Sequence, residues 1–373
     1  MLRRLRVAAL ALVAAPLLLP PAAQAADRTV PKGFLGVVAD RSAVDGTVPL
    51  GAQMRRMASS GAETVGLAFN WLDAQPDANR PPDFASIDRR VRAAAAAGLA
   101  VHPVLIAAPA WARKNPGEEF SPPADPAAYA AFAAELVRRY GPRGSFWDEN
   151  PKLRRLPIAD WQIWNEPVGG DGDATPSVFW VDDEPFEQGF IALMRAARDA
   201  IKAVDPSATV VMGALVGRSW QTLQRIYDAG GRGAFDAVAL HPYTSDAKDV
   251  VRIVRYVRAT MARNGDGALP IQITELGWPA FDAASVRKLG RKRSFAVQAG
   301  WLRATFRRLI SQRERLGIDL LLWYTWIGTD RSDRDAFDHS GLLTRRADGR
   351  LRAKPSLGAF SAVARRAQGR STG

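Results

Sequence analysis

The stretch WQIWNEP, residues 161–167, is a short apolar run that stops abruptly at Asn165, Glu166 and Pro167. Apolar runs of this length, bounded by proline, are typical of a buried strand. An unpaired carboxylate at the buried end of a strand is costly, so Glu166 needs either a partner or a chemical role.

The same pattern recurs along the chain. Short apolar runs alternate with longer amphipathic segments, as in PAAYAAFAAELVRRYG, where Tyr129, Phe132, Leu136 and Tyr140 share one helical face. Eight strands alternating with helices require crossovers and hence a parallel sheet, which predicts a single (β/α)8 barrel over residues 26–373. A doubly wound open sheet is the alternative. The predicted strands are Phe34–Val38, Thr64–Phe69, Ala100–Leu105, Asp160–Trp164, Thr209–Met212, Ala237–Leu240, Ile271–Thr274 and Leu320–Tyr324.

The first 25 residues have the pattern of an export signal. Arginines at positions 3, 4 and 6 precede the apolar residues 7–19, and Ala23-Gln24-Ala25 resembles a cleavage site. We therefore expect a secreted protein that begins near Ala26. No later run is apolar and long enough to span a bilayer.

Composition excludes several classes of function. The chain has no cysteine and three histidines, which excludes disulfides and thiolate catalysis and disfavours a histidine-rich metal site. The net charge of +13 lies mostly on polar faces of predicted helices, and no nucleic-acid motif accompanies it. The basic run 287–293 permits two readings, an anionic-glycan contact or a solvated helix start. We expect no cofactor, no metal, no nucleic-acid partner and a monomer.

Polar and aromatic side chains follow the predicted strands where a barrel carries its active site. Asn165 and Glu166 end the fourth strand, His241 and Tyr243 the sixth, and Glu275 the seventh. Two carboxylates facing each other across a barrel mouth, with aromatic residues nearby, favour glycoside hydrolysis of an oligosaccharide or polysaccharide. The rim tryptophans are Trp71, Trp111, Trp278 and Trp326, and Trp180 lies in the fourth βα loop.

The motifs WQIWNEP and ITELGW (residues 273–278), with SFWDENP (145–151) and WYTW (323–326), resemble a large clan of (β/α)8 retaining glycosidases. The resemblance covers nearly the whole mature chain and is greatest to bacterial members near glycoside hydrolase family 39, with families 5 and 10 related. It implies hydrolysis of β-linked sugars by double displacement, with Glu166 as the acid/base and Glu275 as the nucleophile.

The resemblance also implies the roles of neighbouring residues. Asn165 would bind the sugar 2-hydroxyl, Tyr243 would donate to the nucleophile, and His241 would orient the acid/base or the sugar. Trp326 would form the floor beneath the sugar, and Trp323 is the alternative floor. His102, early in the third strand, is interpreted as structural.

One departure from the clan pattern stands at Gly66. Clan members usually carry an arginine there, five positions before Trp71, and this arginine keeps the nucleophile ionised. Its loss predicts a raised pKa for Glu275. A carbohydrate-binding barrel with weak or no catalysis is therefore the second hypothesis, and an inert scaffold or adhesin is the third. The sugar and the linkage are left open.

Overall fold

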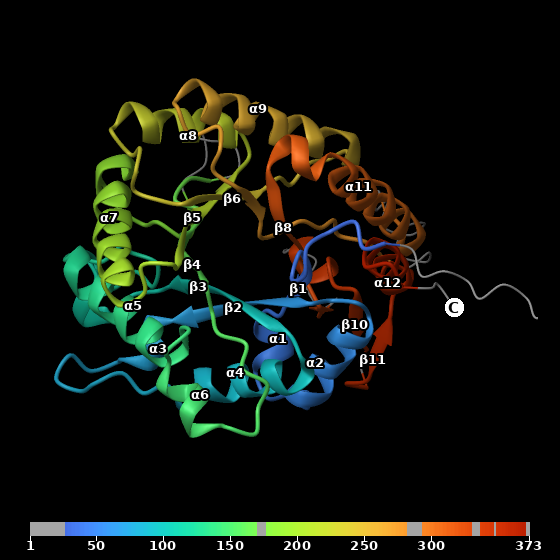
Figure 1. Cartoon of the computed structure of the whole chain (residues 1–373), viewed down its shortest axis with the longest axis horizontal. Helices are drawn as coiled ribbons and strands as arrows, with labels where there is room; N and C mark the ends of the chain where they lie inside the picture. Colours follow the sequence, from blue (N-terminus) through green and yellow to red (C-terminus); the bar gives the residue numbers. More distant parts are fainter. Residues whose placement is uncertain (1–26, 170–176, 282–292, 330–335, 347, 371–373) are drawn as a thin grey trace, which may run out of the picture.

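A computed structural model describes residues 27–169, 177–281, 293–329, 336–346 and 348–370. Eight parallel strands close into a barrel in which neighbours follow the sequence order, and β8 pairs with β1 (Figure 1). The strands are β1 (Leu35–Val38), β2 (Thr64–Asn70), β3 (Ala100–Ile106), β4 (Asp160–Asn165), β5 (Thr209–Val216), β6 (Ala237–His241), β7 (Ile271–Ile273) and β8 (Ile318–Trp323). The predicted barrel is confirmed, and the open sheet is excluded.

Helices ring the barrel from outside (Figure 1). They are α1 (Arg41–Val44), α2 (Leu50–Ser59), α3 (Trp71–Ala74), α4 (Ala85–Ala97), α5 (Pro126–Tyr140), α6 (Ser145–Glu149), α7 (Phe186–Val204), α8 (Ser219–Asp228), α9 (Val250–Arg263), α11 (Phe295–Leu316) and α12 (Pro355–Ala367). A small sheet of β9 (Ile327–Gly328), β10 (Leu343–Arg345) and β11 (Leu351–Ala353) follows β8. None of the helices in the described ranges is long and apolar enough to cross a membrane.

Local chemistry sets the helix ends. Helix α5 begins where the Asp125 carboxylate accepts the backbone N–H of Ala127 and Pro126 takes the first turn. It ends at Tyr140, and the four aromatic and leucine residues predicted to share a face are all buried. Helix α11 ends at Leu316 and is capped by Gly317, whose φ of 63° is the left-handed conformation that glycine adopts easily.

The barrel separates two apolar regions. Outward-facing strand residues such as Val65, Leu67 and Phe69 join the large core beneath the helices. Inside the barrel, Val211, Ala214, Ala237 and Ala239 form a separate small cluster. Three of these four side chains are single methyl groups, so this part of the interior is filled by small residues.

The closest backbone approach in the barrel wall lies at Gly36 in β1. A Cβ atom there would stand 2.2 Å from the Thr64 carbonyl oxygen of β2, so Gly36→Ala forces two paired strands apart. We expect it to lower the free energy of unfolding by about 2 kcal/mol or more, measured by urea denaturation.

Gly300→Ala is the matched control, because no atom lies within 4 Å of the added methyl in α11. It should stabilise the protein by about 0.5–1 kcal/mol through helix propensity. Equal stability of the two variants would contradict this account of the barrel wall.

Candidate active site

The two predicted catalytic carboxylates lie at the carboxyl ends of their strands. Glu166 follows the last residue of β4, and Glu275 lies two residues beyond β7. Trp164 and Glu166 have positive φ angles of 65° and 38°, which is uncommon for residues other than glycine. Glu166 is held there because its N–H donates to the Ala214 carbonyl (3.0 Å) and its carbonyl accepts from the Ser177 hydroxyl.

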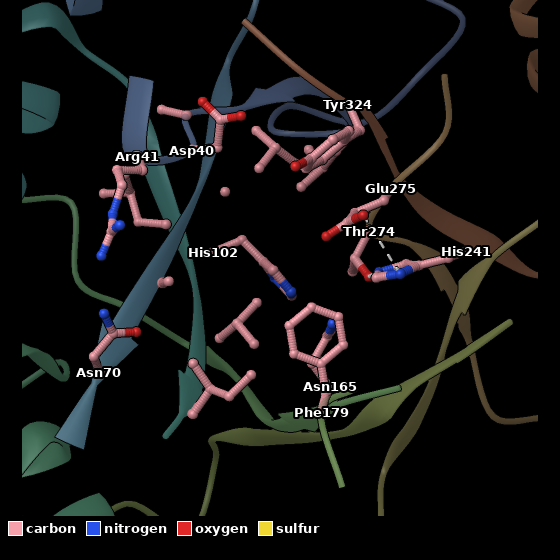
Figure 2. A pocket seen from close by; sticks show the side chains of 18 of the residues that line it. Asp40, Arg41, Asn70, His102, Asn165, Phe179, His241, Thr274, Glu275 and Tyr324 are labelled. Carbon is pink, nitrogen blue, oxygen red and sulfur yellow. Dashed lines mark hydrogen bonds and ion pairs between the residues drawn. The ribbon is translucent and has the colours of Figure 1, made fainter. Parts of the chain in front are cut away.

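His241, the last residue of β6, joins the two carboxylates. Its Nδ1 lies 2.5 Å from Glu166 Oε1 and 3.5 Å from Glu275 Oε2, while Nε2 lies 3.1 Å from the Thr274 hydroxyl. Figure 2 shows Glu275, Thr274 and His241 meeting at one side of the pocket. An Nδ1 atom that faces two carboxylates carries a proton and donates it.

Tyr243 completes the arrangement, because its hydroxyl donates to Glu275 Oε2 at 2.7 Å. Burial and the Glu275 charge raise the pKa of Tyr243 well above its ordinary value, so it remains a donor. The Glu166 and Glu275 side chains are 19% and 20% exposed, whereas His241 is 1% exposed. The carboxylates therefore reach solvent, and the imidazole between them does not.

Burial dominates the electrostatics of the pair. Burial, and next the repulsion from Glu166, raise the pKa of Glu275 to about 7, although His241 and the Tyr243 hydrogen bond act in the opposite direction. Burial disfavours the charged imidazole, yet Glu275 and Glu166 outweigh it and raise the pKa of His241. The raised pKa of Glu275 agrees in direction with the prediction made from the missing arginine.

A pocket of about 210 Å³ opens beside these groups (Figure 2). It contains three of the predicted site residues, Asn165, His241 and Glu275. Glu166 and Tyr243 adjoin it through their hydrogen bonds to His241 and Glu275. The other lining residues are Val38, Ala39, Asp40, Arg41, Gly66, Leu67, Ala68, Asn70, His102, Val104, Ile106, Phe120, Phe179, Thr274, Leu322 and Tyr324.

The tryptophans predicted after β8 do not reach this pocket. Trp326 is fully buried and donates to Gln53 Oε1 at 3.1 Å, and Trp323 is fully buried and donates to the Ser340 carbonyl at 3.1 Å. The side chain of this segment that lines the pocket is Tyr324, which lies between them. The expectation that Trp326 or Trp323 faces the pocket is therefore wrong in this structure, because Leu322 and Tyr324 are the residues of this segment on the inward side.

The other rim tryptophans also pack elsewhere. Trp71 is buried against Phe132 and donates to Gln75, because it opens α3 and faces the helix layer. Trp111 is 40% exposed, but it lies edge-on against Trp71, outside the pocket. Trp278 is buried and donates to the Thr244 carbonyl.

Trp180 is likewise buried, in edge contact with Trp164, so it offers no sugar platform in this structure. Its neighbour Phe179 lines the pocket instead, in edge contact with Phe120. The sequence analysis singled out Trp180 in the loop that follows β4, whereas the preceding residue, Phe179, is the one that lines the pocket.

Asp40 was missed by the sequence reasoning, although VVAD ends the first strand as NEP ends the fourth. Burial raises the pKa of Asp40 to about 7, against hydrogen bonds from Thr325 and Ser42 that lower it. Its Oδ1 is buried without a hydrogen-bond partner. Asp40 thus adds a second acidic side chain to the pocket wall, beside Glu275.

His102 proves to be part of the pocket as well as of the barrel interior. It is buried, and its Nε2 lies 3.3 Å from Gln162 Oε1. Gln162 in turn donates to the Trp164 carbonyl at 3.2 Å, behind Asn165. A structural role, as predicted, explains the hydrogen bond between His102 and Gln162. It does not explain why His102 also lines the pocket.

Metal binding has one candidate group among the described residues. Glu166, His241 and Glu275 each offer a ligand atom, and these atoms lie within 4.8 Å of one another. His241 donates a hydrogen bond to Glu166 and Tyr243 donates one to Glu275, and these bonds explain why the three groups lie close together. The basic run 287–293 lies outside the described residues except for Arg293, which donates to Pro279 and stacks over Trp301.

No protein-family model matches the sequence, and no curated protein is similar to it. Solved structures of the same fold include a family 39 glycoside hydrolase from Bacteroides cellulosilyticus WH2, at 20% identity and a TM-score of 0.64. The alignment covers 90% of this chain but 64% of that protein.

Two further structures extend the likeness. A monomeric β-xylosidase from Caulobacter crescentus CB15 has 19% identity and a TM-score of 0.64, covering 91% of this chain and 69% of that one. A GH5_18 protein from Streptomyces cattleya, in complex with Manβ1-4GlcNAc, has 18% identity and a TM-score of 0.61, covering 89% and 80%. At such identities the comparison establishes the barrel fold that the sequence resemblance implied.

The raised pKa of Glu275 has a consequence for stability. Its carboxyl prefers the protonated form in the folded state, so its contribution is full below about pH 4.5 and is lost as pH rises through about 7. Glu275→Gln has no charge to bury. We expect its free energy of unfolding, relative to the wild type, to rise by roughly 1–3 kcal/mol between pH 4.5 and pH 8 in urea titrations.

Glu314→Gln is the control, since that side chain is 83% exposed. It should show no such change with pH. A constant difference between Glu275→Gln and the wild type would show that the folded protein does not raise this pKa.

Proposed function

We propose that this protein is a glycoside hydrolase that cleaves β-linked sugars with retention of configuration. The observation that carries the proposal is the pair Glu166 and Glu275, whose nearest oxygens lie within 4.8 Å across the barrel mouth. Retaining enzymes hold their carboxyl groups about 5–5.5 Å apart, whereas inverting enzymes leave about 6.5–9.5 Å for a water molecule. The likeness of the fold to known glycoside hydrolases supports the same reaction class.

Glu275 is assigned as the nucleophile. The Tyr243 hydroxyl donates to Glu275 Oε2 and so fixes the orientation of the carboxylate. The other carboxylate oxygen, Oε1, is then available to attack the anomeric carbon. Attack forms a bond between Glu275 and the anomeric carbon while the glycosidic C–O bond breaks. The Tyr243 and His241 donors stabilise the ionised state that attack requires.

Glu166 is assigned as the acid/base. It protonates the leaving oxygen as the glycosidic bond breaks, and then takes a proton from the water that hydrolyses the glycosyl-enzyme. His241 is a positioning residue, because its short hydrogen bond holds the Glu166 carboxylate beside the pocket. Asn165, at the pocket wall, is assigned to the sugar 2-hydroxyl.

We also propose export and a monomeric state. The signal-like residues 1–25 support export, although they lie outside the described part of the chain. The partner is an oligosaccharide or polysaccharide. Export is tested by expressing the full sequence in a bacterium and recovering the protein from the medium. Its intact mass then shows whether the chain has been cleaved near Ala25.

The first test is intact mass spectrometry after incubation with activated 2-fluoro glycosides in the gluco, xylo, manno and glucurono series. The expected result is a covalent adduct on the peptide that contains Glu275, absent in Glu275→Ala. Glu166→Ala should still accumulate the adduct, because the activated leaving group needs no acid, and should lose about 10²–10⁴-fold in the turnover of unactivated substrates. No adduct, together with stabilisation by sugars, would support the carbohydrate-binding barrel.

The pH dependence of kcat/KM tests the nucleophile separately. Because Glu275 must be ionised, activity should rise with pH through about 7 in the wild type. Tyr243→Phe removes a donor that lowers this pKa, so its rise should move to higher pH. Tyr256→Phe, on an exposed side chain, should leave the profile unchanged. An acidic limb near pH 4.5 would contradict the assignment.

A further inference from the structure

The pocket runs far down the inner face of two neighbouring strands. Three successive inward positions on β2 and three on β3 line it, and these positions are paired in the sheet. Five residues of a strand span roughly 13 Å at about 3.3 Å per residue. The paired positions are Gly66 with His102, Ala68 with Val104, and Asn70 with Ile106.

The depth of this space is visible at Ala68. It lies in the middle of β2, yet it is exposed, while its neighbours Leu67 and Phe69 are buried beneath the helices. Val104 opposite is only half-buried. The interior of a (β/α)8 barrel is normally filled by layers of large side chains, so an exposed alanine there marks a space open to the pocket.

The space does not lie directly over Gly66. This residue has no side chain, and even a Cβ atom there would meet Val38 Cγ2 and Leu322 Cδ1 at 3.2 Å. Those two side chains therefore close over Gly66 and form an apolar wall. We call the space bounded by Gly66, Ala68, Val104 and Leu322 the interior hollow.

The interior hollow selects against charge. Its walls are aliphatic, and its end is His102, whose pKa burial lowers, so the imidazole is neutral there. The arginine of the pocket, Arg41, is exposed and points away from Asp40, toward Asn70 (Figure 2). A carboxylate in the hollow would lose its hydration without a cation beside it.

We propose that the interior hollow receives an uncharged, methyl-bearing substituent of the sugar bound at Glu275, so that the substrates are deoxy or acetylated β-glycosides. The proposal rests on the proposed function in one respect, that Glu275 and Asn165 place the ring at the pocket mouth. Burial of the methyl group is the source of selectivity, and one such group changes kcat/KM by about 10-fold or more.

The test compares four 4-nitrophenyl β-glycosides that differ by one substituent: the glucoside, the 6-deoxyglucoside, the 2-acetamido-2-deoxyglucoside and the glucuronide. We expect kcat/KM for one or both of the methyl-bearing substrates to exceed that for the glucoside by about 10-fold or more. The glucuronide should be the poorest. Preference for the 6-deoxy or for the acetamido substrate identifies the substituent.

Ala68→Leu fills the interior hollow from β2, and Ala68→Val fills it more gently if the leucine variant does not fold. Either should abolish the methyl preference, so that the ratio of kcat/KM for the preferred substrate to kcat/KM for the glucoside falls about 10-fold. Ala131→Leu is the matched control, because it adds the same atoms on the exposed face of α5. It should retain the preference.

Thermal denaturation with the free sugars separates this inference from the proposed function. Stabilisation by the 6-deoxy or the N-acetyl sugar over glucose, lost in Ala68→Leu, supports the hollow even if no substrate turns over. Turnover with equal kcat/KM for the glucoside and the methyl-bearing substrates overturns the inference and leaves the hydrolase. Neither turnover nor stabilisation by the methyl-bearing sugars also overturns it.

Discussion

The site depends on holding two carboxylates and one imidazole close together at the barrel mouth. Glu166 and Glu275 repel each other, and the Nδ1–H of His241 lies between them, at 2.5 Å from one and 3.5 Å from the other. Without this donor the pair would carry the full cost of two partly buried charges. His241 is itself buried, and the Thr274 hydroxyl fixes its second nitrogen.

The barrel supplies the positions for this arrangement. Parallel closure brings the carboxyl ends of β4, β6 and β7 to one edge, although Glu166 and Glu275 are far apart in the sequence. The positive φ angles of Trp164 and Glu166 lie at the end of β4, where the Glu166 N–H donates to the Ala214 carbonyl of β5 and the Ser177 hydroxyl donates to the Glu166 carbonyl. Strain of this kind persists only where the surroundings over-determine it, and it often accompanies function.

Burial governs the electrostatics of the site. His241 and Tyr243 stabilise the charge of Glu275, yet burial raises its pKa to about 7. The pocket beside it is lined in part by aliphatic side chains, and it is open at Ala68 and Val104. Any activity must accommodate a weakly ionised carboxylate and an apolar pocket wall together.

The sequence by itself determined the barrel, the eight strands and the polar groups at their ends. Alternation of apolar runs with amphipathic segments is a local pattern, and a parallel barrel places every strand end on one rim whatever the loops do. It also predicted a raised pKa for Glu275, although in the structure burial of the carboxyl is the main cause.

Only the tertiary structure decided which aromatic residues face the pocket. Trp71 faces the helix layer because a helix begins at that residue. Tyr324 rather than Trp326 lines the pocket, on the same side of the segment as Leu322. A shift of one residue turns a side chain from the pocket to the core, and composition cannot resolve such a shift. The open space beside Ala68 is likewise visible only in the tertiary structure, in which Val38 of β1 and Leu322 of β8 pack over Gly66 while Ala68 remains exposed.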